Sequence, residues 1–376
     1  MDTRATGIPA AAPDETGEWE RGVAASDSKA GKAPTRRQTG APTLSDVAHE
    51  AGVSPMTVSR VINADGKVRP GTRQRVERAI ATLNYRPNIS AQILAGVSQL
   101  RIGLLYSNPS AAYLNEFLVG CLGAASQAQA QLLVEICEPG QEGATAARVL
   151  SGGIDGLLLP PPLCDSEDVL AALVGSGLPA VRVGTWYAEP ATGAVSIDGY
   201  AAARTMTAHI AALGHRRIGF IRGNPDQTAS ERRFLGYRDG MREAGLAVDP
   251  DLVAPGLFTY RSGLEAAEHL LARPEPPTAI FASNDDMAAA TVAVALRRGL
   301  AVPDDLTVCG FDDTAIATTI WPELTTIRQP IREMSHAAMV LLLKAARACR
   351  LGQEPERTHI VLDHALIRRA SDGPPR

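Results

Sequence analysis

Apolar residues recur at helical spacing in three short runs near the start of the chain. The first run begins at Leu44 and stops at Gly52, a residue type that commonly ends helices. The second follows Ser54, a good N-terminal cap, and the third covers residues 72–83. The sequence therefore predicts three helices that pack together. Their inward residues are Leu44, Val47, Ala48, Ala51, Val58, Val61, Ile62, Val76, Ala79, Ile80 and Leu83.

The first two predicted helices match the helix-turn-helix pattern. Ala48 is small where the helices would cross, Gly52 stands at the turn, and Val58 and Val61 lie under the second helix. Most outward residues of that helix can donate to phosphates or base edges, which argues against the alternative of a three-helix piece of a larger core. These outward residues are Met56, Thr57, Ser59, Arg60 and Asn63.

From residue 100 onward, short apolar runs alternate with amphipathic helical patterns. This alternation is typical of parallel sheets covered by helices on both faces, and about 280 residues are too many for one small sheet. We therefore expect two doubly wound α/β lobes. Strands are predicted at 102–106, 132–136, 156–159, 180–183, 194–197, 218–221, 279–282 and 306–310, and helices at 114–129, 167–174, 200–213, 231–244, 262–271, 287–298 and 331–348.

The distribution of charge matters more than its total. The chain has 376 residues, is 45% hydrophobic and carries a net charge of −4, which alone would argue against a nucleic-acid partner. Residues 43–96, however, contain seven Lys or Arg against four Asp or Glu. A small basic module thus precedes a large acidic body.

The cysteines and the apolar runs indicate the cellular compartment of the protein. Five cysteines without a CxxC pair suggest reduced thiols, and they indicate no metal site or cofactor. The first residues lack a signal-peptide core, and apolar runs such as 156–162 are too short for a membrane span. We expect a soluble, cytoplasmic protein that needs no cofactor.

Enzyme motifs are missing from the sequence. It contains no GxSxG elbow, no GxxxxGK[ST] loop and no GxGxxG that opens a helix after a strand. Paired aspartates such as Asp312 and Asp313 could act as acid and base, but a binding role requires fewer assumptions. We predict that the protein is not an enzyme.

Residues 43–96 resemble the DNA-binding segment of the lactose repressor family of bacterial transcription regulators. The resemblance continues from the helix-turn-helix through Asn84-Tyr85-Arg86-Pro87-Asn88 to residues 89–96. It implies a homodimer with one recognition helix of each subunit in the major groove of operator DNA. The residues implied to contact DNA are Thr43, Ser54, Pro55, Met56, Thr57, Ser59, Arg60, Asn63, Tyr85, Asn88, Ala91 and Leu94.

The end of this segment and the start of its second helix each carry a distinct prediction. In the family, the segment after the third helix is a hinge that folds on operator DNA and inserts a leucine, by position Leu94, into the minor groove. Residues 89–95 are too few for a stable isolated helix, which fits a hinge, although an ordinary linker is the alternative. Pro55 and Met56 occupy the positions that the family uses most for operator discrimination, and they offer only apolar contacts. The operator therefore cannot be copied from a relative.

The resemblance also implies a domain organisation similar to that of periplasmic sugar-binding proteins. We expect a disordered tail (1–42), a helix-turn-helix domain (43–87), a hinge helix with linker (88–99) and a two-lobe effector-binding and dimerisation domain (100–370). The first lobe would comprise 100–198 and 328–357, and the second 199–327 and C-terminal strands near 359–367. The chain would cross between lobes near Asp198, Arg328 and Thr358.

A ligand site is expected beyond the carboxyl ends of the strands, between the lobes. Ser107 and Asn108 follow the first strand, and further polar groups follow the strands that end near residues 282 and 310. Carboxylates and amides bind adjacent hydroxyls, and an aromatic ring packs on the C–H face of a sugar. This set of groups suits a polyhydroxylated molecule.

The resemblance assigns roles to individual cleft residues. It places Arg233 of ERRFLG and Asp312 of GFDD on the effector, with Asn284 of SNDD in the cleft and Phe258 stacked on the ligand. Each has an alternative: Asn284 or Asp312 could cap the next segment, Arg233 could face outward, and Phe258 could belong to the core. The predicted ligand-binding residues are Ser107, Asn108, Phe258, Arg233, Asn284 and Asp312.

Together these features predict a homodimeric repressor of carbohydrate-utilisation genes, whose operator affinity is set by a sugar-like effector. Two alternatives remain: a regulator that uses a purine or nucleoside corepressor, and a solute-binding module. The basic segment 43–96 and the missing signal peptide disfavour the module.

Overall fold

The computed structural model describes residues 42–62, 68–83, 85, 99–187 and 191–376. The chain divides into two compact units, Met1–Gln92 and Ile93–Arg376. Asn63, Asn88, Ala91 and Leu94, and with them the predicted hinge, lie outside the described residues, as does nearly all of the predicted tail.

The first unit contains the three predicted helices, α1 (Leu44–Ala51), α2 (Pro55–Ile62) and α3 (Pro70–Thr82). Thr43 caps α1: its side chain accepts from the Asp46 N–H, and the Asp46 carboxylate accepts from the Thr43 N–H at 2.7 Å. Gly52 ends α1 in the left-handed region at φ 62°, where glycine is favoured. The apolar faces form one small core, so the predicted three-helix arrangement is confirmed.

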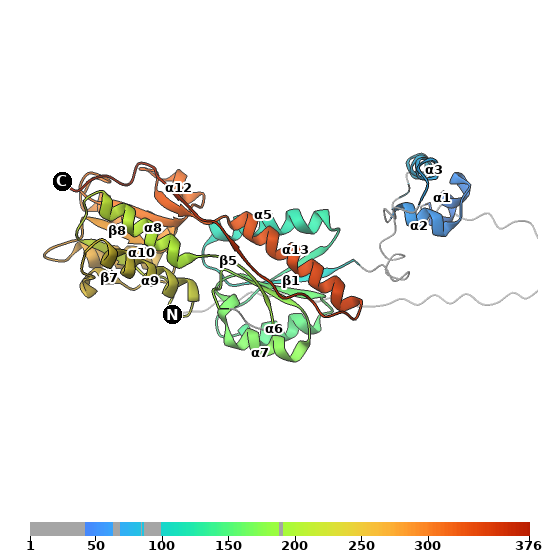
Figure 1. The fold of residues 1–376 in the computed structure, drawn as a ribbon, viewed down its shortest axis with the longest axis horizontal. Helices are drawn as coiled ribbons and strands as arrows, with labels where there is room; N and C mark the ends of the chain where they lie inside the picture. The colour runs from blue at the N-terminus through green and yellow to red at the C-terminus, as the bar shows by residue number, and fades with distance from the viewer. Residues whose placement is uncertain (1–41, 63–67, 84, 86–98, 188–190) are drawn as a thin grey trace, which may run out of the picture. The chain divides into compact units, whose positions relative to one another are not determined.

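The second unit begins with a parallel six-stranded sheet, in the order β11-β5-β4-β3-β1-β2. Its strands are β1 (Arg101–Tyr106), β2 (Gln131–Ile136), β3 (Gly156–Leu159), β4 (Ala180–Val183), β5 (Gly193–Ile197) and β11 (His359–Leu362). Successive strand residues enter different cores: Leu158 packs in one cluster, Leu157 and Leu159 in another. Helices therefore cover both faces (Figure 1). They are α5 (Ala111–Gln127) and α13 (Ile331–Arg350) on one face, and α6 (Glu142–Ser151) and α7 (Glu167–Ser176) on the other.

The second sheet repeats this pattern in the order β12-β10-β9-β8-β6-β7, with only β12 antiparallel. Its strands are β6 (Ile218–Ile221), β7 (Val253–Ala254), β8 (Ala279–Ala282), β9 (Thr307–Asp312), β10 (Thr325–Arg328) and β12 (Ala365–Ile367). The helices are α8 (Gly199–Ala212) and α9 (Thr228–Glu243) on one face, α10 (Tyr260–Leu271) and α11 (Asp285–Arg297) on the other, and the short α12 (Ile316–Thr319). Short 3-10 turns lie at Leu163–Asp165 and Pro250–Leu252. The two doubly wound lobes are confirmed.

The third crossing between the lobes differs from the expectation. The segment 359–367 does not belong to the second lobe as a whole, because β11 pairs in parallel with β5 of the first sheet, from His359 beside Ala194 to Leu362 beside Ile197. Without β11, β5 would be an open edge. The chain consequently crosses after Leu362 and not near Thr358, and only β12 joins the second sheet.

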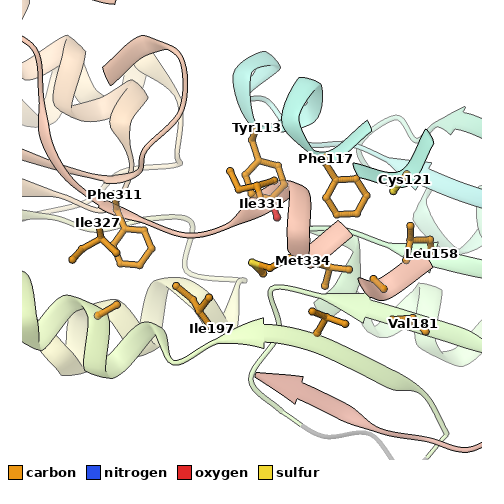
Figure 2. Packing of buried hydrophobic residues seen from close by; sticks show 14 of the residues in the cluster. Tyr113, Phe117, Cys121, Leu158, Val181, Ile197, Phe311, Ile327, Ile331 and Met334 are labelled. Carbon is orange, nitrogen blue, oxygen red and sulfur yellow. The ribbon is translucent and has the colours of Figure 1, made fainter. Parts of the chain in front are cut away.

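The two lobes share one buried hydrophobic cluster around the crossing segments. Figure 2 shows Phe311 and Ile327 of the second lobe near Ile197, with Ile331 and Met334 of α13 leading into the first lobe. This continuous packing positions the facing ends of the two sheets. Among the described residues, no helix is long and apolar enough to cross a membrane.

Candidate functional site

Helix α2 presents a buried face and an exposed face. Val58 and Val61 lie in the three-helix core, whereas Met56 is 64% exposed and Arg60 is exposed in the last turn. Ser54 caps the helix by accepting from the Thr57 N–H at 3.2 Å. Packing of the buried face in the three-helix core fixes the orientation of the exposed face. A recognition helix that contacts DNA needs this arrangement.

The other residues predicted to contact DNA are placed differently. Thr43, Pro55 and Ser59 are at least partly exposed, on α2 or at the cap of α1. Tyr85, in contrast, is only 8% exposed and packs in the three-helix core, where its N–H donates to the Ile80 carbonyl at 3.0 Å. Tyr85 thus stabilises the module through its packing.

A cavity lies at the carboxyl ends of the strands of both lobes, as expected. It contains about 490 Å³ of space that protein atoms do not fill, part of it open to solvent. The first lobe contributes Asn108, Pro109, Ser110, Tyr113, Pro161 and Gly184; the second contributes Gln227, Ala229, Arg233, Phe258, Asn284 and Asp312; the crossing segment contributes Gln329. The cavity is therefore polar, with aromatic side chains on its wall.

Arg233 of α9 is buried inside this cavity and does not face outward. Its guanidinium carbon lies 3.7 Å from the centroid of the Phe311 ring, and Nη1 donates to the Ser283 carbonyl. Nη2 lies 3.5 Å from a carboxylate oxygen of Asp312, and burial lowers the pKa of Arg233 despite this partner. Its buried Nε has no hydrogen-bond partner. An N–H donor in this state favours a ligand that brings an acceptor.

Asp312 ends β9 in an unusual backbone conformation. Its φ of 115° lies in the region that favours glycine, and strain of this kind is typical of functional sites. Gln329 Nε2 donates to its carboxylate at 2.6 Å. Burial raises the pKa of Asp312 to about 7, although Arg233 lowers it; the nearby Asp286 raises it further. This carboxyl can therefore change its charge near neutral pH.

Asn284 and Phe258 act as a pair. Asn284 caps α11, as the sequence alternative allowed: its side-chain oxygen accepts from the Met287 N–H at 3.0 Å, and its amide donates to the Phe258 carbonyl at 2.9 Å. That bond holds Phe258 at a φ of 60°, with its ring partly in the core and partly on the cavity wall. Gly223 leaves room for the ring, because a Cβ there would lie 1.9 Å from Phe258 Cζ.

The first-lobe residues are less directly involved. Asn108 lines the cavity, but its amide donates to the Pro161 carbonyl at 3.2 Å and its oxygen accepts from the Ser110 N–H at 2.8 Å. Ser107 is not among the lining residues. Sequence reasoning missed Gln329, which follows β10 directly; its place after a strand was the available signal, but a single glutamine forms no motif.

A buried polar group joins the lobes beside the cavity. Asp165 of the first lobe pairs with Arg182 at 3.0 Å and accepts from the N–H and hydroxyl of Thr228, at 2.9 and 2.8 Å. Thr228 is the first residue of α9 in the second lobe, where a carboxylate also favours the helix dipole. Trp186 adds a contact with Arg232, whose guanidinium carbon lies 4.5 Å from the indole centroid. Trp186 thus contacts the second lobe directly, whereas Arg182 holds Asp165 from within the first lobe, and neither residue lines the cavity.

Two family models match the chain. One, described as bacterial regulatory proteins of the lacI family, covers residues 43–88, and the other, described as a periplasmic binding protein-like domain, covers residues 207–371.

Curated relatives match both units of the chain. Catabolite control protein A of Priestia megaterium is 33% identical over 305 residues, which cover 80% of this chain and 92% of the relative. The HTH-type transcriptional regulator CelR of Thermobifida fusca is 35% identical over 336 residues, which cover 87% of this chain and 97% of the relative.

Solved structures of related regulators match the same parts of the chain. The lac repressor dimer bound to operator and the anti-inducer ONPF has a TM-score of 0.70 at 29% identity, and the match covers 88% of this chain and 98% of that one. A CelR–cellobiose complex has a TM-score of 0.67 at 32% identity, with 88% and 99% covered. These matches extend over the three-helix unit and the two lobes.

Proposed function

Because this chain belongs to the lacI family of bacterial regulatory proteins, we propose that it represses carbohydrate-utilisation genes and that a sugar in the cleft sets its operator affinity. The family makes it a transcription regulator with a DNA-binding domain and an effector-binding domain. We assign residues 43–87 to the first role, 88–99 to a hinge and 100–370 to effector binding and dimerisation. We place its action in the cytoplasm, where bacterial operator DNA is found.

The observation that carries the sugar assignment is the arrangement of Asp312, Arg233 and Phe258 on one cavity wall. Asp312 can accept from two adjacent hydroxyls, the Nε of Arg233 can donate to a ring or hydroxyl oxygen, and Phe258 can pack on C–H groups. The ionised Asp312 neutralises Arg233, so the wall then offers no excess positive charge for a phosphate. The site therefore favours a neutral sugar, and the cellobiose complex of the relative CelR supports this assignment.

Effector and DNA would be coupled through the angle between the lobes. A sugar that binds across the cleft stabilises one angle, and that angle determines how well the two hinge segments of a dimer pair on DNA. In this mechanism Leu94, outside the described residues, enters the minor groove. By thermodynamic linkage, operator DNA must change sugar affinity by the same factor as sugar changes operator affinity.

A thermal-shift screen tests the proposed function. The full chain is mixed with neutral sugars, sugar phosphates and purines, and the screen is repeated with an operator selected from random duplexes. We expect stabilisation by a neutral sugar and weaker stabilisation when operator is present. A shift with a purine alone, enhanced by operator, would instead identify a corepressor-dependent regulator. Stabilisation by a sugar with no effect of DNA would support the solute-binding alternative.

Arg60 should contact a base of the operator through hydrogen bonds. Replacing Arg60 by alanine should weaken binding to the selected operator by about 1–3 kcal/mol and relax the preference at one base position, because a bidentate contact to guanine would be lost. Fluorescence anisotropy with the operator and its single-base variants measures both effects. Arg75→Ala removes the same charge from the exposed face of α3 and serves as the matched control. Equal weakening on every sequence by Arg60→Ala would show that Arg60 contacts only phosphate.

Sugar affinity should depend on pH through Asp312. The pKa of about 7 means that the folded protein holds a proton that must leave before the carboxylate can accept from two hydroxyls. Affinity should therefore rise as pH increases, by about tenfold between pH 6 and pH 8, with release of a proton on binding. Calorimetry in two buffers of different ionisation enthalpy measures the proton count. Asp312→Asn should remove the dependence, and a flat profile in the unmodified protein would exclude this role of the carboxylate.

A further inference from the structure

A second cavity lies in the first lobe, at the end of the sheet opposite the cleft. It contains about 790 Å³ of space that protein atoms do not fill, part of it open to solvent, against about 490 Å³ for the cleft. Ala180 and Gly193, which line it, begin β4 and β5, whereas Gly184, just beyond the end of β4, lines the cleft. The two cavities therefore lie at opposite ends of the same strands.

The wall of this second cavity is largely apolar. Its side chains come from the end of α7, the start of β4, one face of α13 and the segment that leads into β11. They include Leu173, Leu178, Val181, Leu341, Ala345 and Pro355, and the charged residues of the lining are Glu356, which pairs with Lys344 at 2.6 Å, and Arg357. Val174 of α7 also lines the cavity and is 76% exposed, so the apolar surface extends from the cavity to solvent. A concave, mostly apolar site is typical of small-molecule binding.

One polar group on this wall lacks a partner. Thr192 is only 9% exposed, and its buried hydroxyl makes no hydrogen bond. Leaving a buried hydroxyl without a hydrogen bond is unfavourable, so such groups are uncommon in folded proteins. A bound molecule with a hydroxyl or carbonyl group could satisfy it. Thr192 therefore indicates a ligand through an observation independent of the cavity volume.

Helix α13 connects this cavity with functional parts of the second unit. Ala345 and Cys349 line the cavity, and the next residue, Arg350, donates to the carbonyl of Gln99 at 3.2 Å, just before β1. At its other end, α13 begins two residues after Gln329, which donates to Asp312 in the cleft. A molecule that packs against α13 here would act on an element that both sites share.

We propose that this cavity is a second ligand site, which takes a compact, largely apolar molecule with one hydroxyl or carbonyl group directed at Thr192. The molecule differs in class from the cleft ligand, because most of the wall is aliphatic and the buried Arg233–Asp312 pair belongs to the cleft alone. It binds with or without a sugar in the cleft, and it packs against α13, the helix that both sites share.

Cys349 provides a reporter for the test. It is half-buried, whereas Cys121, Cys137, Cys164 and Cys309 are buried, so iodoacetamide should alkylate Cys349 selectively in the folded full-length protein. We use benzyl alcohol as the probe and toluene as its counterpart without the hydroxyl. Benzyl alcohol should slow alkylation of Cys349 in a saturable manner. Absence of protection at the solubility limit of both probes would overturn the proposal.

Two variants locate the binding. Thr192→Val keeps the shape of the side chain and removes its hydroxyl, so it should weaken benzyl alcohol about three- to tenfold and leave toluene unchanged. Ala345→Leu fills the cavity from α13 and should abolish protection by both probes. If Ala345→Leu does not fold, the test rests on Thr192→Val alone: its affinity for benzyl alcohol should fall relative to its affinity for toluene. Unchanged protection by benzyl alcohol in Thr192→Val would place the probe elsewhere and overturn the proposal.

Discussion

Replacing Asp312 by alanine should abolish the stabilisation of the protein by its sugar effector. The variant loses the carboxylate that can accept from two hydroxyls, and hydrogen bonds to a charged group contribute about 1.5–3 kcal/mol each. It also leaves Arg233 buried without its acidic partner, which should lower the stability of the free protein. We therefore expect a lower melting temperature, sugar affinity reduced by at least about 100-fold, and an operator complex that sugar no longer dissociates.

Asp313 supplies the matched control for this experiment. It is the next residue and is also buried in ion pairs, with Arg369 at 2.5 Å and Arg328 at 2.7 Å, but it does not line the cavity. Asp313→Ala should lower the melting temperature and keep the sugar-induced shift. A normal shift in Asp312→Ala would remove Asp312 from the site, whereas loss of the shift in both variants would indicate general damage to the lobe.

The local features of the fold were predictable because they depend on neighbouring residues. The cap at Thr43, the stop at Gly52 and the apolar face through Val58 and Val61 follow from spacing within a few residues, and the structure confirms each. Most strands of the two sheets were also predictable, since continuous apolar runs between amphipathic helices have few other uses, but the short strands β7 and β10 were missed. These features sufficed for the fold class.

The remaining features depend on contacts between distant segments. The place of β11 in the first sheet is decided by β5, which lies more than 160 residues away in the chain, and the segment itself carries no signal for one lobe over the other. The same holds for Gln329, whose partner Asp312 belongs to another strand, and for Tyr85, whose burial depends on helices packed around it. Motif reasoning gave Arg233 a role but could not show that its Nε lacks a partner.

Charge placed on α5 or β2 should separate the protein into monomers and thereby remove tight operator binding. These neighbouring elements expose aliphatic side chains at the edge of the first sheet: Val119 and Leu122 on α5, and Val134 and Ile136 on β2, with Ile136 66% exposed. Such a patch is unusual on a monomer. We therefore assign it to the dimer interface, where a two-fold axis would bring each patch against its copy.

Ile136→Asp would then bury two like charges in one interface, one from each subunit. Because this burial opposes association, the variant should sediment as a monomer at micromolar concentration. It should lose about 100- to 10,000-fold in affinity for the full operator, because the second recognition helix no longer binds as part of the same molecule. Its affinity for a single half-site and for sugar should change little. Val174→Asp places the same charge on α7, on the opposite face of the sheet, at a position that is 76% exposed, and this variant should remain dimeric. A dimeric Ile136→Asp with unchanged operator affinity would exclude this patch as the interface and direct the search to the exposed side chains of the second lobe, such as Trp321 and Leu257.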